Sequence, residues 1–317
     1  MAEPTDSREK RLAELKKVVT KRGFDHHASL LNNIQELPAE LQSPAVTELA
    51  AQYAIQTIVV FPQQIQRGWH YVPKQALMFT ATGLTHLLAS IWPDQEPQIT
   101  CIEGGDLIYM RVTLLLLYGF LEIVAQGQDF PTRLDMEFNT VAWHRLSPPL
   151  RQLLQASRVR QNASVDEASH ASNTWKALDQ LPVKFSNGVK IYGLLPGEDL
   201  EELVFQPDVW KPWLYFFRQP VLANTLLLLT TNYLVVIQEE LKVKQGWILS
   251  YIPRENITGM QNQPCGQCNE ISVPLIRGGQ SADYKLLLQS DAVEAWKTRW
   301  IQHGGLWKDL PRQVEMK

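Results

Sequence analysis

Cysteine is scarce in this sequence. Among 317 residues there are three, Cys101, Cys265 and Cys268. A small, odd number excludes the dense disulfide framework that holds small secreted domains together. Such usage is typical of a reducing compartment, so we predict a cytoplasmic protein.

An excess of charge of either sign is also absent. The chain has 30 Lys and Arg residues against 33 Asp and Glu residues, a formal net charge of −3. This balance argues against the basic footprint of nucleic-acid-binding proteins, so no nucleic-acid partner is expected. The rest of the composition, 45% hydrophobic and 20% charged, is that of a globular chain. The length leaves room for about two domains of ~150 residues each.

Long apolar runs are missing too. A membrane-spanning helix needs about 20 predominantly apolar residues. The longest run without charge, Gln219 to Gln238, contains a proline and several hydroxyl and amide residues. The charged N-terminus lacks the apolar stretch of a secretory signal. We therefore expect neither a membrane-spanning helix nor export by that route.

The apolar segments that are present have the form of paired strands. Thr225–Ile237 reads TLLLLTTNYLVVI. The short polar side chains of Thr230, Thr231 and Asn232 suit a turn and would be costly in hydrocarbon. Gln75–Ser90, QALMFTATGLTHLLAS, has the same form with a glycine in its turn. Each stretch predicts two neighbouring strands.

The two halves of the chain carry such segments in the same order, each followed by one amphipathic helix. The segments are 55–62, 77–89, 107–124 and 134–138 in the first half, and 200–207, 226–237, 247–260, 270–276 and 284–288 in the second. One closing helix is predicted to have Ser147 as its N-cap and Pro148 as its first residue, and the other to have Ser290 as its N-cap. Arg158 to Thr174, rich in Ser, Asn, Gln and Ala, is typical of a linker.

On these features the second half resembles the pleckstrin-homology-like (PH-like) domains of bacteria. The segments that carry the resemblance are LLLLTTNYLVVI (226–237), YIPRENITGM (251–260) with its Ile-Pro step, and DAVEAWKTRW (291–300), which is similar to the closing helix with its Trp. The match spans about residues 198–303. The first half matches more weakly, because it has Trp143 ahead of its closing helix and no Ile-Pro step.

This resemblance implies an α+β, mainly β fold. We expect two PH-like domains, each a bent sheet or barrel closed by a C-terminal helix, after a helical N-terminus. The predicted boundaries are a helical N-terminal segment at 1–50, a degenerate PH-like domain at 51–157, a linker with a helix at 158–185, a PH-like domain at 186–303 and a C-terminal tail at 304–317.

The N-terminal segment predicts a basic helix over residues 5–23. Asp6 and Glu9 have the spacing of a capping pair, and Gly23 ends the pattern. Its basic faces are compatible with an interfacial membrane helix. Its aliphatic stripe is narrow and lacks Trp and Phe, which favours packing on its own domain or on a partner.

The sharpest chemical motif is Cys265-Gly-Gln-Cys268. Such a pair can supply half of a tetrahedral zinc site or a redox couple. No second pair accompanies it, and it lies in a segment rich in Pro, Gly, Gln and Asn. We favour a hairpin turn with incidental thiols, with zinc binding across a dimer or redox chemistry as alternatives. The sequence contains no phosphate loop, nucleophile elbow or histidine ligand spacing. We predict no enzyme activity, no cofactor and no metal site.

The stretch Val209–Arg218, VWKPWLYFFR, is the candidate interaction site. Trp and Tyr supply large, rigid contact areas, although packing in a core is the alternative use. The candidate residues are Trp210, Lys211, Trp213, Tyr215, Phe217 and Arg218. Eukaryotic PH relatives carry a basic lipid-headgroup motif in this region. Two cations are too few for such a motif, so recognition of inositol phosphates is not expected.

We therefore predict a non-enzymatic interaction module that binds a protein partner or self-assembles. The alternative is a peripheral membrane protein. In that case the basic N-terminal helix and the aromatic segment 209–218 would contact lipid together, so that two weak contacts add.

Overall fold

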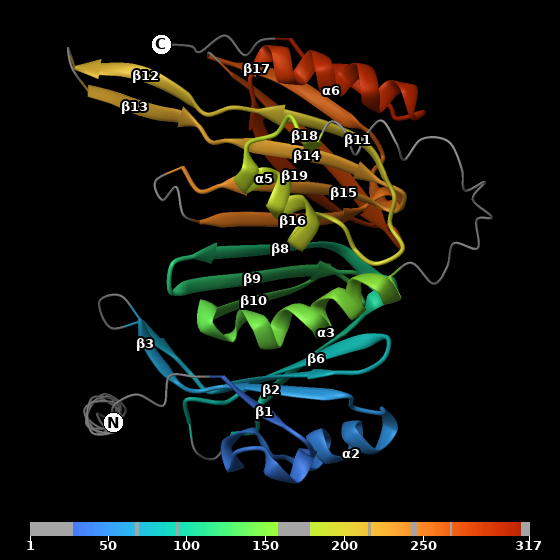
Figure 1. Cartoon of the computed structure of the whole chain (residues 1–317). Helices are drawn as coiled ribbons and strands as arrows, with labels where there is room; N and C mark the ends of the chain where they lie inside the picture. The colour runs from blue at the N-terminus through green and yellow to red at the C-terminus, as the bar shows by residue number, and fades with distance from the viewer. Residues whose placement is uncertain are drawn as a thin grey trace, which may run out of the picture. The chain divides into compact units, whose positions relative to one another are not determined.

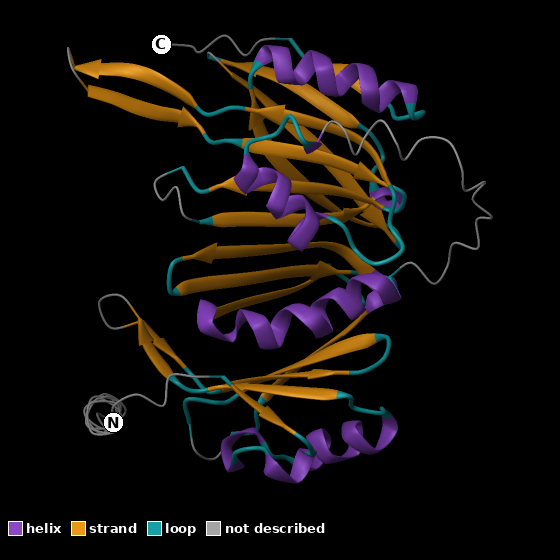
Figure 2. Cartoon of the chain, viewed as in Figure 1, coloured by secondary structure: helices purple, strands orange, loops and turns teal. Residues whose placement is uncertain are grey.

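The computed structural model describes residues 28–66, 70–92, 95–157, 178–214, 217–241, 246–266 and 268–311. Most of the regular structure in these residues is β-strand, with few helices (Figure 2). This confirms the predicted α+β, mainly β class. The predicted helix at 5–23 and the linker at 158–174 lie outside the described residues. No helix in the described part of the chain is long and apolar enough to cross a membrane.

The chain divides into two compact units. One comprises residues 1–101 and 141–149, and the other comprises residues 102–140 and 150–317. Helix α3 (Trp143–Ala156) begins in the first unit and ends in the second. The domain boundaries at 51–157 and 186–303 stay a prediction.

The first unit is built on a five-stranded sheet in the order β1-β2-β5-β6-β7. Its strands are β1 (Ser29–Leu31), β2 (Thr57–Phe61), β5 (Gln75–Phe79), β6 (Gly83–Leu88) and β7 (Gln98–Glu103). Short strands β3 (Gln64–Gln66) and β4 (His70–Val72) form a separate hairpin. Helix α2 (Pro44–Gln52) begins after Ser43, whose hydroxyl accepts a hydrogen bond from the Val46 amide at 3.2 Å. Val46 is buried in the same core as Ile58 and Met78 of the sheet.

The second unit contains one seven-stranded sheet and one four-stranded sheet (Figure 1). The seven-stranded sheet has the order β10-β9-β8-β16-β15-β14-β11, and the four-stranded sheet has the order β19-β18-β17-β20. The strands are β8 (Leu107–Leu115), β9 (Tyr118–Ala125), β10 (Thr132–Asn139), β11 (Leu200–Gln206), β14 (Thr225–Thr230), β15 (Tyr233–Glu239), β16 (Trp247–Pro253), β17 (Met260–Cys265), β18 (Cys268–Arg277), β19 (Gln280–Leu288) and β20 (Trp307–Asp309).

The apolar stretch Thr225–Ile237 forms the predicted strand pair. Leu229 lies opposite Leu234 in the β14–β15 register, so the polar residues between them make the turn. The predicted barrel is wrong, because none of the sheets in the described chain closes on itself. The reason is that β16 pairs with β15 on one edge and with β8 on the other, which extends an open sheet.

Helix α6 (Ser290–Gln302) places Val293, Trp296 and Trp300 in the core of the second unit, as its apolar spacing predicts. The two indole rings stack with centroids 6.4 Å apart. The predicted cap is wrong. Gln289 occupies the N-cap position, and the Ser290 hydroxyl accepts a hydrogen bond from Asn269 Nδ2 at 3.2 Å.

Helix α3 also begins earlier than the sequence suggests. It follows the 3-10 turn η4 (Thr140–Ala142), so Pro148 and Pro149 lie inside the helix instead of at its start. Leu146 is buried like Leu150, which extends the apolar stripe N-terminally by one turn. Burial of this extra turn outweighs the hydrogen bond that an internal proline removes.

The elements of the second half follow the order of those in the first. From β2 in the first half and from β11 in the second, one strand is followed by a two-stranded hairpin and then by three further strands. A 3-10 turn, η3 (Gly104–Asp106) or η6 (Arg254–Asn256), comes next. Strands β14, β15 and β18 begin at residues 225, 233 and 268, which lie 150 positions after the starts of β5, β6 and β9 at 75, 83 and 118.

Candidate interaction site

The aromatic segment forms a hairpin of its own. Strands β12 (Val209–Leu214) and β13 (Phe217–Leu222) make a separate two-stranded sheet between β11 and β14. Figure 1 shows this hairpin extending beyond the neighbouring ends of β14 and β15. A two-stranded ribbon has no core of its own, because it has no further layer to cover either face. The predicted contact residues therefore lie on a projecting element.

Five of the six candidate residues lie in the two strands: Trp210, Lys211, Trp213, Phe217 and Arg218. Tyr215 is outside the described residues. Trp210 is 39% exposed, and its indole N–H donates to Asp208 Oδ2 at 2.7 Å. Lys211 is exposed as well. Trp210 and Lys211 are thus both accessible, and as neighbours in β12 they lie on opposite faces of the ribbon.

Two prolines protect the hairpin from further strand pairing. Pro212 lies in β12 and Pro220 in β13, and each lacks the amide hydrogen that a ladder needs. The register also shifts between Val209 and Trp210 and again between Pro212 and Leu214. Prolines and bulges are features that keep exposed edge strands from pairing with other chains. A partner is therefore expected to contact the hairpin through its side chains.

A chain of polar contacts fixes the base of the hairpin. The Asp208 amide donates to Asn224 Oδ1 at 2.8 Å, and Asn224 Nδ2 donates to Glu239 Oε2 at 2.6 Å. Glu239 is buried, and its other carboxylate oxygen pairs with Lys184 Nζ. The same ammonium lies 4.4 Å from the centroid of the Trp247 ring. Paired and buried in this way, these groups hold both ends of the hairpin against β15.

A second contact ties the base of the hairpin to the start of α6. Gln206, the last residue of β11, is buried; its Nε2 donates to the Ala223 carbonyl at 3.4 Å. Its Oε1 accepts from the Gln289 amide at 2.6 Å. The sequence gives no signal for these partners, because Gln206 and Glu239 are far from their contacts along the chain.

A cavity of about 340 Å³ opens beside this base. Apolar residues from the hairpin end, the segment after β15, β16 and β19 form most of its wall, among them Leu222, Leu241, Ile248 and Leu287. Lys285 and Glu270 also line it and pair with each other at 2.7 Å. A cavity of this kind beside the hairpin that carries exposed Trp210 is suited to an apolar anchor side chain from a partner.

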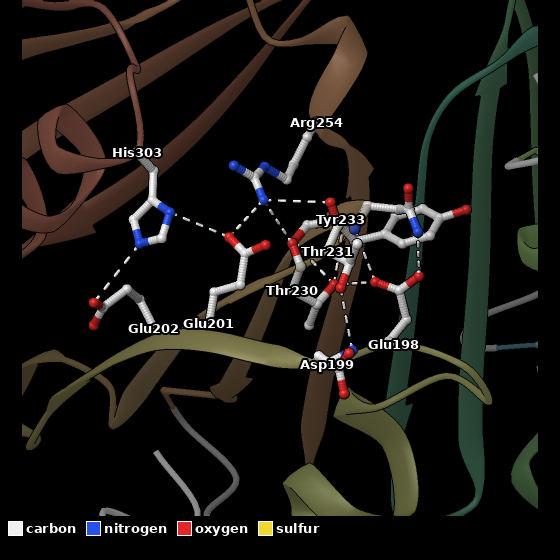
Figure 3. A network of polar contacts seen from close by, with 10 residues as sticks. Glu198, Asp199, Glu201, Glu202, Thr230, Thr231, Tyr233, Arg254 and His303 are labelled. Atoms are coloured by element: carbon white, nitrogen blue, oxygen red, sulfur yellow. Dashed lines mark hydrogen bonds and ion pairs between the residues drawn. The ribbon is translucent and has the colours of Figure 1, made fainter. Parts of the chain in front are cut away.

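A larger polar network lies on β11 and the β14–β15 turn (Figure 3). Its centre is Glu198, a buried carboxylate that accepts from Thr230 Oγ1 at 2.6 Å, from the Asn232 amide at 2.9 Å and from Asn232 Nδ2 at 2.7 Å. The carboxylate therefore supplies the acceptors that the polar turn residues need. This explains why the turn tolerates burial.

The network continues to α6. Arg254 Nη1 donates to Glu201 at 2.7 Å and to the Thr230 carbonyl at 3.0 Å. His303 has its two ring nitrogens 3.2 Å from Glu201 and 3.7 Å from Glu202 (Figure 3). A histidine between carboxylates is also found in catalytic sites, but here the hydroxyl of the central threonine is already bonded to Glu198. The network connects the turn, β11 and α6 and is best interpreted as structural.

Cys265 and Cys268 lie opposite each other at the β17–β18 turn, where Gly266 has a φ of +62°. Cys268 Sγ is 3.2 Å from the Cys265 carbonyl, and burial raises the pKa of the Cys268 thiol. A redox-active or metal-binding thiol usually has a lowered pKa. Among the described residues there is no group of three or more His, Cys, Asp and Glu side chains that could hold a metal ion.

Comparisons with known proteins leave the family open. No family model matches the chain, and no curated protein matches it. Among solved structures, the hSac2 domain from human phosphoinositide phosphatase Sac2 covers 47% of this chain and 94% of its own, at 14% sequence identity and a TM-score of 0.29. A similarity at this level carries no argument about fold or activity.

Proposed function

We propose that this chain is a protein-binding module whose contact element is the β12–β13 hairpin. The observation that carries the proposal is a projecting hairpin with exposed Trp210 and Lys211 on a rigid base. A rigid, aromatic surface loses little conformational entropy when it binds. The cavity beside the base gives such a surface a place for an anchor residue.

We further infer that residues 186–303 are a PH-like domain and that residues 51–157 are a degenerate copy. The shared element order supports this, as does the spacing of 150 positions between the starts of β5, β6 and β9 and those of β14, β15 and β18. Helix α6 with buried Trp296, at the end of the second half, fits the closing helix of the resemblance. The pairing of β8 with β16 is a departure from two separate domains.

A protein partner is favoured over a membrane surface. The hairpin sequence carries two cations, Lys211 and Arg218, against several aromatic residues. Each cation near an anionic membrane contributes about 1 kcal/mol, so two would give marginal binding. The basic helix predicted at 5–23 lies outside the described residues.

The test is quantitative affinity capture with the tagged full-length chain. We expect the double substitution Trp210→Ser with Lys211→Glu to reduce recovery of a partner at least tenfold. The matched control is Leu117→Ser, which alters a residue that is 68% exposed in the β8–β9 turn. Equal loss in both variants, or no loss in the hairpin variant, would contradict the proposal. Salt-sensitive binding to anionic vesicles, lost in the hairpin variant, would favour the membrane alternative.

A further inference from the structure

Strands β8 and β17 hold equivalent places in the two halves. Each follows a 3-10 turn, and each begins a run of three antiparallel strands, β8-β9-β10 or β17-β18-β19. With the spacing of 150 positions, Met110 in β8 corresponds to Met260 in β17. The outer edges of β8 and β17 can therefore be compared directly.

Different strands cover these two edges. Residues 110–112 of β8 pair with residues 249–251 of β16 in an antiparallel register. The equivalent residues 260–262 of β17 pair in parallel with residues 307–309, the three-residue strand β20. The three-residue parallel strand β20 thus lies on the edge of β17, whereas the equivalent edge of β8 pairs with the seven-residue antiparallel strand β16.

The counterpart of β16 in the first half is β7. Both precede a 3-10 turn directly, and both are the third strand after the hairpin of their half. Both edges of β16 are paired, and most of its residues are buried. In contrast, β7 ends the strand order of its sheet, and Gln98 and Cys101 are exposed. Among the described strands, none pairs with the second edge of β7.

Strand β20 is three residues long and is held by backbone bonds at its two ends and by the side chain of Asp309. The Met260 amide donates to the Leu306 carbonyl at 2.9 Å, and the Leu310 amide donates to the Asn262 carbonyl at 2.8 Å. Asp309 accepts from Lys297 at 2.6 Å and from Asn262 Nδ2 at 3.0 Å. The Lys297 ammonium and the donors Trp307 and Asn262 lower the pKa of Asp309 to about 2. Leu306, just before the strand, is 72% exposed, whereas Trp307 in the strand is half-buried and packs on the core of the second unit, so displacing β20 exposes the apolar area of one indole ring.

We propose that β7 of a second copy of this chain can replace β20 on the edge of β17. The resulting β7–β17 pair between two molecules would have the same arrangement as the β16–β8 pair within one chain. While β20 occupies the edge of β17, it would prevent this pairing. Because β7 and β17 are different surfaces, the contact is heterologous and can continue head to tail from copy to copy. The proposal is independent of the hairpin, since neither β12 nor β13 takes part.

The β16–β8 pair within the chain gives the register that we expect between two copies. Ser250 lies opposite Arg111 in the β16–β8 pair. With the spacing of 150 positions, Thr100 of one copy is expected opposite Gln261 of the other. Directly opposed residues of antiparallel strands bring their Cβ atoms within about 5.5 Å, close enough for a disulfide after a small adjustment.

Disulfide trapping between two full-length variants tests this register. Both variants carry Ser at positions 101, 265 and 268 together with Asp309→Lys, which places like charges at β20 and Lys297. One also carries Thr100→Cys and the other Gln261→Cys. On mild oxidation of the mixture we expect a heterodimer at a yield at least fivefold above that of the same pair with Asp309 retained.

The control pair combines Thr100→Cys with Lys285→Cys, at an exposed position on β19. Equal heterodimer yields from the two pairs, or none from the Gln261→Cys pair, would overturn the proposal. Circular dichroism checks that Asp309→Lys remains folded. If it does not, Asp309→Asn, which keeps the shape and removes the charge, takes its place in the same assay. The hairpin substitutions should leave the yield unchanged, which separates this result from the proposed function.

Discussion

Glu198 is the residue on which the β14–β15 turn depends most. It is 8% exposed, and its carboxylate accepts three hydrogen bonds from Thr230 and Asn232. A buried carboxylate is stable only when its oxygens are bonded, and its donors are costly to leave without an acceptor. The turn that the sequence identifies by its polar residues is thus completed by a residue about 30 positions away.

Glu198→Ala should lower the free energy of unfolding by about 2–4 kcal/mol, since it leaves several buried donors unsatisfied. Urea unfolding monitored by circular dichroism measures the loss. Glu294→Ala on the exposed face of α6 is the matched control and should change stability by less than about 0.5 kcal/mol. A loss from Glu198→Ala no larger than that of the control would show that the turn does not need the carboxylate.

His86 makes the first unit sensitive to acid. It is buried with Nε2 3.1 Å from Gln75 Oε1, and burial lowers its pKa from 6.5 to about 4. Between these values the unfolded chain binds more protons than the folded chain. The contribution of neutral His86 to stability is therefore complete above pH 6.5 and declines as pH falls toward 4, by at most about 3 kcal/mol.

Urea midpoints measured from pH 7 to pH 4 test this. The wild-type midpoint should fall across the window, whereas His86→Gln, which keeps a polar side chain next to Gln75 and does not titrate, should show a smaller fall. Parallel curves for the two proteins would mean that His86 is not the titrating group.

Among the elements, the β12–β13 hairpin depends on its base. Asn224 joins the Asp208 amide to the buried Glu239. Asn224→Ala removes both bonds, so hydrogen exchange in β12 and β13 should become at least tenfold faster while exchange in β16 stays the same. Thr258→Ala, which removes an exposed hydroxyl bonded to the Pro274 carbonyl, is the control. Unchanged exchange in the hairpin would mean that Asn224 does not hold it.

Elements with local signals could be predicted from the sequence. The β14–β15 pair follows from apolar runs around Thr230 to Asn232. The cluster at 209–218 indicates a candidate contact site, but the β12–β13 hairpin does not follow from it, because the same aromatic residues are also typical of a core. The start of α3 could not be predicted, because burial of Leu146 outweighs the local preference of Pro148 for a first turn.

Contacts between distant elements left no signal in the sequence. The β8–β16 pairing depends on backbone amides, which every residue except proline has, so no side chain marks the partner. The same holds for the base of the hairpin, where Lys184, Asn224 and Glu239 come from three separate segments. The aromatic residues of the candidate site could therefore be identified from the sequence, whereas the residues that hold the base of the hairpin could not.

At the scale of the whole molecule, the repeated element order joins the two proposals. The second half carries the longer hairpin, with strands of six residues, where the first half has strands of three. If the second half binds a partner through β12–β13 and the first half pairs through β7 with a second molecule, the chain combines a surface for a partner with a surface for self-association.

The central claim is that a protein partner contacts the β12–β13 hairpin. Site-specific photo-crosslinking tests it most directly, with a benzophenone amino acid at position 211 or, as the matched control, at position 117 of the full-length chain. The account predicts a discrete adduct with a second protein from position 211 and none from position 117. Adducts of equal yield from both positions, or none from position 211 under conditions where the partner is recovered by affinity capture, would contradict it.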